Sequence, residues 1–505
     1  MNNSFNFEET LSEVTSALIY SNTPLWESQY VPAIELILRL HARGIPLTHL
    51  TCKGALNSCP ANPFHELKKC ISCRVITRQA EKSLIPEEVR VEELSVFDEI
   101  AVPYFDSQRE FKEFRHGKLP AGELAYSQLV DDASDLNIPL STLNLRGRKL
   151  LSEAINLYDQ SLKIMVRDSI QTVFAWNGRR SSDGPVLYAA RQLGLKAYSF
   201  SSGGTPEKFF FQENSLHSIE EWSKSISSYA SKYEKSFIDM EAEAKEFFSN
   251  QRFGNRISYA NSFFGNNFSQ KYISKSESSK KLLVIFTSSQ WETINYFENS
   301  ILHPDLQDPY RLIQRILEEK LILDKYKVVV RWHPNLQNAG KTETERVQEI
   351  IEMTPSIEHV KPESKIDSYS LLLASDIVLT TGSTMGVEAN FYQKPSILLG
   401  TALYMNLNVC HIPTDYDELL NLLLKEVTVH SRSGSVLYGS FFAMHGFDIA
   451  NFSVTGDIYT WKNESLSALL NRRPIATRII KFIYNSIGSW YLKILKNPPK
   501  ESRRK

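Results

Sequence analysis

Two polar segments in the C-terminal half carry side chains that can bind phosphate, and each follows a short apolar run. The first is His333-Pro334-Asn335, which follows the β-branched run 327–332. The second is Thr381-Gly382-Ser383-Thr384, which follows the apolar run 376–380. Imidazole and hydroxyl groups donate hydrogen bonds to phosphate oxygens, and a glycine allows close approach to the backbone. We therefore expect a phosphorylated ligand at these segments.

A parallel sheet must position these two segments. Over 327–399, continuous apolar strands alternate with amphipathic helices, a pattern that indicates a parallel sheet covered on both faces. Ligands of such sheets bind beyond the carboxyl ends of the strands, and both segments fall at that edge. A further strand is expected at 282–286, and the serines that follow it add hydroxyl donors.

The predicted donor-binding residues combine a fork-shaped cation, an imidazole, hydroxyls and one carboxylate. A helix that starts after Ser383 and Thr384 would add backbone N–H groups and a partial positive charge. Glu388 lies one helical turn after Thr384, so its carboxylate can accept the hydroxyls of a ribose. Each residue has a simpler alternative role as a cap or a surface charge, and their joint occurrence on neighbouring strand ends favours a site. The set is Ser288, Ser289, Arg331, His333, Gly382, Ser383, Thr384 and Glu388.

The N-terminal half contains a second unit of this type, with strands at 171–176 and 197–200 and a helix between them. Its first strand ends at Asn177-Gly178-Arg179, which could hold an acceptor or the donor sugar. Three acidic residues follow loops of the two halves and are candidates for a catalytic base: Asp183, Glu207 and Glu292. An acidic residue at a helix start is otherwise a partner of the helix dipole.

Four of the five cysteines fall within 22 residues, with the spacing C-x6-C-x10-C-x2-C: Cys52, Cys59, Cys70 and Cys73. A CxxC pair is a common half of a structural zinc site, in which His65 could replace one cysteine. The same pair also suits thiol exchange, and small buried cysteines are a third interpretation. The sequence leaves these three open. No further cluster of ligands favours a catalytic metal.

Composition excludes some functions. The chain has 505 residues, of which 42% are hydrophobic and 23% charged, and its net charge of −1 gives no general attraction to nucleic acid. Its length indicates two large domains. The first twenty residues lack the pattern of a secretory signal, and no window of about 18 apolar residues is present. We therefore expect a cytoplasmic protein.

Positive charge gathers at the C-terminal end. Residues 472–505 carry a net charge of +9, which leaves −10 for the rest of the chain. Within 475–496, apolar and basic residues lie on opposite faces of an expected helix. Such a helix suits the surface of an anionic membrane, and a helix packed on the core is the alternative.

The organisation predicted from these patterns has five parts. They are an N-terminal Rossmann-like acceptor domain at 1–214 with a cysteine-rich insertion at 52–73, a helical and hinge region at 215–280, a nucleotide-sugar-binding core at 281–411, additional helices and loops at 412–470, and a basic amphipathic tail at 471–505. Helical spacing also predicts helices over 86–100, 122–133 and 147–168.

Residues 327–404, with 286–292 before them, resemble the nucleotide-sugar-binding half of GT-B glycosyltransferases. The similarity is to the bacterial capsule-polysaccharide group, which includes Kdo transferases, and more distantly to polysialyltransferases and sugar-nucleotide epimerases. The HP motif of the family stands here as His333-Pro334, and its serine-glycine-glutamate motif stands at 383–389. Residues 176–179 resemble related transferases, whereas 201–204 depart from their acidic-basic-glycine loop.

This resemblance implies an α/β, GT-B-like fold, with two Rossmann-like domains facing across a cleft and a C-terminal helical tail. It places His333, Ser383 and Thr384 at the donor phosphate and Glu388 at the nucleotide sugar. The departure at 201–204 leaves the catalytic base open.

The implied activity is transfer of a sugar from a nucleotide donor, CMP- or UDP-linked, to a growing bacterial surface polysaccharide. The acceptor would be a glycan or a lipid-linked glycan, and no cofactor would be required for catalysis. The alternatives are a sugar-nucleotide 2-epimerase that uses the same cleft and a non-catalytic scaffold of a polysaccharide assembly complex.

Overall fold

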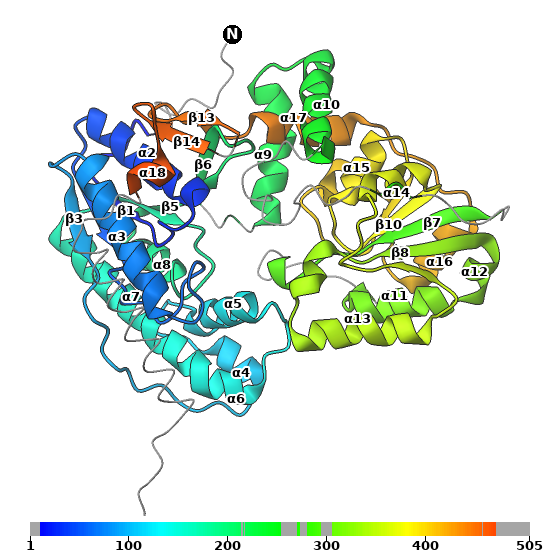
Figure 1. Ribbon diagram of the computed structural model, residues 1–505, viewed down its shortest axis with the longest axis horizontal. Helices are drawn as coiled ribbons and strands as arrows, with labels where there is room; N and C mark the ends of the chain where they lie inside the picture. The colour runs from blue at the N-terminus through cyan, green and yellow to red at the C-terminus, as the bar shows by residue number, and fades with distance from the viewer. Residues whose placement is uncertain are drawn as a thin grey trace, which may run out of the picture.

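The computed structural model describes residues 11–213, 216, 218–253, 270–272, 280–293, 306–456 and 458–470. Figure 1 shows two lobes side by side, each built on a sheet with helices against it. Helices near the middle of the chain join the lobes along one side.

The sheet of the N-terminal lobe has, within the described residues, the strand order β12-β6-β5-β4-β1-β2-β3. Strands β3, β2, β1, β4 and β5 are parallel, whereas β6 runs antiparallel to β5, and β12 antiparallel to β6. The strands are β1 (Ala17–Tyr20), β2 (Leu47–Thr51), β3 (Arg90–Glu93), β4 (Thr172–Trp176), β5 (Lys196–Ser202), β6 (Lys208–Gln212) and β12 (Phe447–Asp448).

The sheet of the C-terminal lobe is parallel across the part of the chain that is described, with the order β11-β10-β7-β8-β9. Its strands are β7 (Lys281–Phe286), β8 (Tyr326–Arg331), β9 (Glu358–Val360), β10 (Ile377–Thr380) and β11 (Ser396–Leu398). In each lobe the first strand in sequence lies in the middle of the parallel strands. The second and third strands lie on one side of it, and the fourth and fifth lie on the other. This is the order of a Rossmann unit, so the predicted α/β fold with two Rossmann-like domains is confirmed.

Helices lie against both sheets, and others join the two lobes along one side (Figure 1). The N-terminal lobe contains α2 (Glu27–Ala42), α3 (Leu67–Ser83), α4 (Gln108–Glu113), α5 (Ala121–Ala133), α6 (Leu140–Thr142), α7 (Arg148–Arg167) and α8 (Gly184–Gln192). The middle of the chain forms α9 (Ile219–Lys232) and α10 (Phe237–Phe253). The C-terminal lobe and the segment after it contain α11 (Pro309–Glu318), α12 (Lys320–Lys325), α13 (Lys341–Met353), α14 (Ser368–Ala374), α15 (Met385–Phe391), α16 (Tyr416–Leu424), α17 (Ser433–Met444) and α18 (Leu466–Leu470).

Burial explains why the central strands are apolar. Every residue of β1, β4 and β10 is buried, because these strands have a neighbour on each side and helices on both faces. Helix α11 shows the complementary pattern, with one buried apolar face formed by Leu312, Ile313 and Ile316 and with polar residues opposite.

The chain returns to the N-terminal lobe after α17. Aromatic residues of α17 pack against α9 and α10, and β12 then pairs with β6. The following strands, β13 (Ser453–Thr455), β14 (Ile458–Trp461) and β15 (Glu464–Ser465), form a small sheet, and α18 packs on α3. Figure 1 shows this last segment beside α2, far from the sheet of the C-terminal lobe.

The structure contradicts one of the sequence predictions. The helix expected over 86–100 is wrong, because Arg90–Glu93 forms β3. This strand lies at the sheet edge and pairs with β2 alone, so its charged side chains stay partly exposed and it lacks the apolar run of a central strand. The basic tail at 471–505 and the end of the hinge region lie outside the described residues, and the five-part division of the chain stays a prediction.

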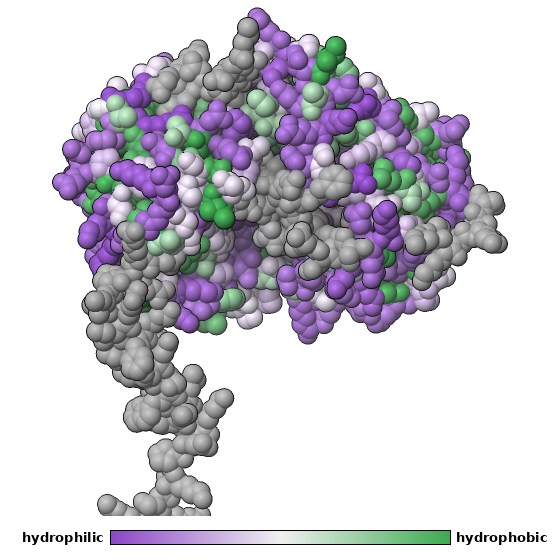
Figure 2. Space-filling view, turned by 45° about the horizontal axis from the view of Figure 1, so that its top comes forward, coloured by the Kyte–Doolittle hydropathy of each residue, from purple (hydrophilic) through white to green (hydrophobic). Residues whose placement is uncertain are grey.

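The face shown in Figure 2 is mainly hydrophilic, and its apolar residues are scattered over both lobes. In the portion of the chain that is described, no helix combines the length and apolar character that a membrane crossing needs.

The close contact between Gly204 and α17 predicts that a side chain at position 204 would destabilise the protein. The backbone N–H of Gly204 donates to the carbonyl of His445 over 3.1 Å, and a Cβ on Gly204 would lie 1.7 Å from the carbonyl oxygen of Phe442. Gly204→Ala should lower the free energy of unfolding by about 3 kcal/mol or more, because a backbone atom cannot move aside cheaply. Denaturant unfolding measures this.

Gly194→Ala is the matched control. Gly194 has a φ of +70° and nothing within 4 Å of an added Cβ, so this variant should lose only about 1 kcal/mol through backbone strain. Equal losses for the two variants would contradict the close packing of α17 on the loop at Gly204.

Candidate functional site

The candidate site lies where the strand order of the C-terminal sheet reverses. Strand β7 runs between β8 and β10, and the β7–β10 boundary is the point at which open α/β sheets form a crevice. The two predicted segments therefore follow β8 and β10, which lie on either side of β7 and do not pair with each other. The loop after β7 stands between them.

Hydrogen bonds join the loop after β7 to the segment after β8. The Oγ of Ser289 lies 3.1 Å from Nδ1 of His333, and the backbone N–H of His333 donates to Oγ1 of Thr287 over 2.8 Å. The N–H of Thr287 in turn donates to the carbonyl of Arg331 over 3.1 Å. These contacts fix the imidazole at the strand edge.

The same loop binds the segment after β10. The N–H of Ser288 donates to Oγ1 of Thr381 over 3.1 Å, and its hydroxyl donates to the carbonyl of Thr381 over 2.9 Å. Gly382 has a φ of +117°, and a Cβ there would lie 2.9 Å from the carbonyl of Thr401. Only a glycine suits this turn, because both the backbone conformation and the space exclude a side chain.

The hydrogen bonds of His333 define its tautomer. Its Nδ1 accepts from the backbone N–H of Asn335 over 3.3 Å, so the hydroxyl of Ser289 must also donate to Nδ1. In the neutral ring the proton is then on Nε2. Burial, together with the charge of Arg331, lowers the pKa of His333 to about 4. The ring therefore offers a neutral N–H donor at physiological pH.

The segment after β10 supplies a hydroxyl and a buried carboxyl. The Oγ of Ser383 accepts from the N–H of Met385 over 3.3 Å, and its proton has no acceptor within the described part of the chain. Thr384 donates to Oε1 of Glu388 over 2.9 Å. Glu388 is 5% exposed, and its Oε2 accepts no hydrogen bond from described residues. Burial raises the pKa of Glu388, an effect that the nearby hydroxyls of Tyr369 and Thr384 reduce.

Three predicted donor-binding residues are engaged within the protein. Arg331 is 1% exposed and donates to the carbonyls of Trp332 and Lys361 over 3.0 and 2.7 Å. Burial lowers its pKa to about 10. The hydroxyls of Ser288 and Ser289 are used by Thr381 and His333. These three side chains position the loops, and direct contact of Arg331 with a phosphate stays a prediction that requires it to leave its carbonyl partners.

The loop after β4 holds the sugar-binding candidates of the N-terminal lobe. Asn177 and Gly178 have φ values of +59° and +89°, so the chain turns sharply at the end of the strand. Arg179 is directed to α5, where it donates to both carboxylate oxygens of Asp131 over 2.8 Å. Its guanidinium is mostly buried, so a role in sugar binding stays a prediction.

The structure does not bring the three candidate bases together. Asp183 is fully buried, and burial raises its pKa to about 6 against the opposing effect of Arg180. Glu207 is exposed in the turn before β6, and its backbone carbonyl accepts from Ile449 over 2.8 Å. The side chain of Glu292 lies outside the described residues. The identity of a base stays a prediction.

The four clustered cysteines are free of disulfides. Burial raises the pKa of Cys73 to about 12, with Cys52 and Cys70 as further causes, and burial also raises the pKa of Cys59. In the stretches covered by the structure, no group of three or more His, Cys, Asp or Glu residues is placed to hold a metal ion. A structural zinc therefore has no support from this geometry and stays a prediction.

Residues outside the predicted donor-binding set complete the site. Thr287 and Thr381 each accept a backbone N–H of a neighbouring loop, and both directly follow strands, which is the signal that could have identified them. Tyr404 donates its hydroxyl to the carbonyl of Ser383 from a segment with no recognisable pattern. Close approach of this ring also requires Gly386, because a Cβ there would lie 2.4 Å from the hydroxyl.

The buried environment of His333 predicts that its imidazole titrates at a lower pH than a free histidine. Its imidazole should stay neutral from pH 8 down to about 5, because burial disfavours the charged ring. The ring signal in a 13C–1H NMR spectrum, assigned by its loss in His333→Gln, reports the protonation state. A midpoint near about 6.5, the value of an unperturbed histidine, would contradict the described environment.

No protein-family model matches this chain, and no curated protein matches it in sequence. Among solved structures, it is similar to the beta Kdo 2,4 transferase KpsC of Thermosulfurimonas dismutans, with 13% identity over 62% of this chain and 94% of that chain and a TM-score of 0.36. It is also similar to UDP-GlcNAc 2-epimerase of Neisseria meningitidis bound to UDP-GlcNAc, with 10% identity over 84% and 97% and a TM-score of 0.30. MurG of Acinetobacter baumannii shares 10% identity over 90% and 98%, with a TM-score of 0.28. A Kdo transferase and a sugar-nucleotide epimerase are among the enzyme types that the motifs at His333 and Ser383 resemble.

Proposed function

We propose that this protein is a glycosyltransferase that binds a nucleotide sugar, CMP- or UDP-linked, at the carboxyl edge of the C-terminal sheet. The observation that carries the proposal is the placement of two hydrogen-bond donors on the loops that flank the loop after β7, one following β8 and the other following β10. The Nε2–H of His333 and the hydroxyl of Ser383 are held on loops that Ser288 and Ser289 connect, and neither proton has an acceptor within the described residues. Two such donors at a topological switch point suit a phosphate group.

These donors would act on the leaving group. Negative charge builds on the departing phosphate during sugar transfer, and fixed donors in a partly buried site stabilise it. A neutral imidazole donor does not depend on a proton from solvent, so His333 would serve across the physiological pH range. Oε2 of Glu388 is the buried acceptor that a hydroxyl of the nucleotide sugar would satisfy.

The acceptor would bind to the N-terminal lobe and meet the donor between the lobes. The lobes touch where the N–H of Gly340 donates to the carbonyl of Ser134 over 2.9 Å and the N–H of Thr342 donates to the carboxylate of Asp135 over 2.9 Å. In this proposal the contact would set the spacing at which an acceptor hydroxyl is aligned with the donor sugar. We further propose a glycan or lipid-linked glycan of a bacterial surface polysaccharide as acceptor, a cytoplasmic location and no cofactor for catalysis.

The first test is a thermal-shift screen of the full chain against CMP-, UDP-, GDP- and TDP-linked sugars. A specific ligand raises the apparent melting temperature because it binds the folded state alone. Failure of every nucleotide sugar to bind would reject the proposal and favour a non-catalytic scaffold.

The second test uses the ligand that this screen identifies. His333→Ala and Glu388→Ala should each weaken its binding about 10- to 100-fold, the effect of one lost hydrogen bond to a charged group, and should abolish transfer. His41→Ala, on α2 of the N-terminal lobe, is the control and should bind normally. Normal turnover by both site variants at saturating donor would reject this assignment of the site.

An epimerase would use the same nucleotide-sugar site, and one incubation separates the two activities. The protein is incubated with the identified nucleotide sugar and no acceptor. Appearance of the 2-epimer would replace transfer with epimerisation as the function, whereas an unchanged sugar supports the transferase.

A further inference from the structure

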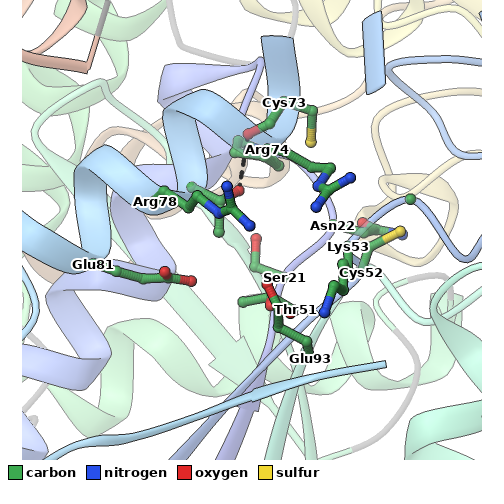
Figure 3. A pocket seen from close by; sticks show the side chains of 13 residues that line it. Ser21, Asn22, Thr51, Cys52, Lys53, Cys73, Arg74, Arg78, Glu81 and Glu93 are labelled. Atoms are coloured by element: carbon green, nitrogen blue, oxygen red, sulfur yellow. Dashed lines mark hydrogen bonds and ion pairs between the residues drawn. The ribbon is translucent and has the colours of Figure 1, made fainter. Parts of the chain in front are cut away.

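A second polar pocket lies in the N-terminal lobe, at the carboxyl ends of β1, β2 and β3 and beneath α3 (Figure 3). The pocket is open on one side, and the space between its walls is about 380 Å³ when the adjoining solvent is included. Ser21 and Asn22 line it from the end of β1, and Lys53 lines it from the end of β2. Carboxyl ends of parallel strands are where ligands of α/β sheets bind.

Two arginines supply positive charge to this pocket. Arg74 and Arg78 are four residues apart on α3, which places them on the same face of the helix, and Figure 3 shows both guanidinium groups directed into the pocket. Neither forms a hydrogen bond or an ion pair with another described residue. Two like charges at this spacing repel each other, so an anion between them would relieve the repulsion.

The other charges of the pocket offset these arginines only in part, because three cationic side chains (Lys53, Arg74 and Arg78) face two acidic ones (Glu81 and Glu93). Lys53 and Glu93, both labelled in Figure 3, form an ion pair at the opposite rim. Glu81 is half-buried, and burial, with the charge of Glu93, raises its pKa, although Arg78 opposes this. With both acids ionised the pocket lining still has one positive charge in excess.

Asn22 favours a ligand that can donate a hydrogen bond. It is 3% exposed, and its Nδ2 donates to the carbonyl of Ser182 over 2.9 Å. Its Oδ1 accepts no hydrogen bond from described residues. A buried acceptor without a donor is costly, so a ligand with a hydroxyl group would satisfy it. Figure 3 shows the hydroxyl of Ser21 directed into the same space.

We propose that this pocket binds a hydroxylated organic anion, a sugar that carries a carboxylate or a phosphate. The guanidinium groups of Arg74 and Arg78 bind the anionic group, and Oδ1 of Asn22 accepts from a hydroxyl of the sugar. The further identification of this ligand as the acidic part of the acceptor rests on the proposed transferase function, whereas the anion site itself does not.

The first experiment measures binding of three probes to the full chain by isothermal titration calorimetry at one ionic strength. The probes are glucuronate, glucose 6-phosphate and glucose. The two anions should bind at least tenfold more tightly than glucose, and the tighter of the two identifies a carboxylate or a phosphate as the preferred group. Equal affinities for glucose and the anions, or no binding of either anion at millimolar concentration, would overturn the proposal.

The second experiment locates the bound anion. Arg74→Gln and Arg78→Gln should each weaken binding of the preferred anion about tenfold, because each removes a charge-assisted hydrogen bond. Lys82→Gln is the matched control, since Lys82 is an exposed cation of the same helix that does not line the pocket. An equal loss in Lys82→Gln would show unspecific attraction to α3 and would overturn the site.

A third measurement separates this site from the nucleotide-sugar site. Arg74→Gln and Arg78→Gln should leave nucleotide-sugar binding unchanged, and His333→Ala should leave anion binding unchanged. If the anion binds and no nucleotide sugar does, the proposed function fails and the pocket stands. Loss of nucleotide-sugar binding in the arginine variants would overturn the pocket as a separate site.

Discussion

The candidate site depends on the hydrogen bonds of one short loop. Residues 287–289 follow the central strand of the C-terminal sheet and bind the loops on both sides, through His333 on one and Thr381 on the other. Without this loop the two motif segments would be connected only through their strands. Its three hydroxyl side chains are short and stiff enough to hold two loops at a fixed separation, which is what recognition of a small anion requires.

Burial sorts the polar residues of this edge into two groups. A polar group that loses water must find a partner, so Arg331, Ser288 and Ser289 are bound to carbonyls and to a ring nitrogen. A side chain can still bind a ligand when its internal hydrogen bonds use one of its polar functions and leave another available. Nδ1 of His333 accepts, which leaves Nε2–H as a donor, and Oγ of Ser383 accepts, which leaves its proton. The internal hydrogen bonds thus decide which functional groups a ligand meets.

The two lobes repeat one strand order but present different chemistry at their carboxyl edges. The C-terminal edge offers neutral donors, whereas the pocket of the N-terminal edge offers two guanidinium groups on α3. Both suit anions, and each includes residues that follow the first strand of its sheet, Ser288 and Ser289 after β7 and Ser21 and Asn22 after β1. The return of the chain through α17 and β12 connects the lobes, so the segment after the second sheet helps to complete the first.

The sequence by itself determined the central strands and the position of His333 and Ser383 at their ends, because a strand covered on both faces must be apolar and a loop must follow it. Only the tertiary structure decided that β7 lies between the two motif strands, that Arg331 turns inward, and that residues 90–93 form a strand rather than part of a helix. It also brought Arg74 and Arg78 over the ends of β1 and β2. These features depend on contacts between residues far apart in the chain, and local periodicity carries no information about such pairing. An edge strand such as β3 is the extreme case, since it needs a partner on one side only and can therefore consist mainly of charged residues.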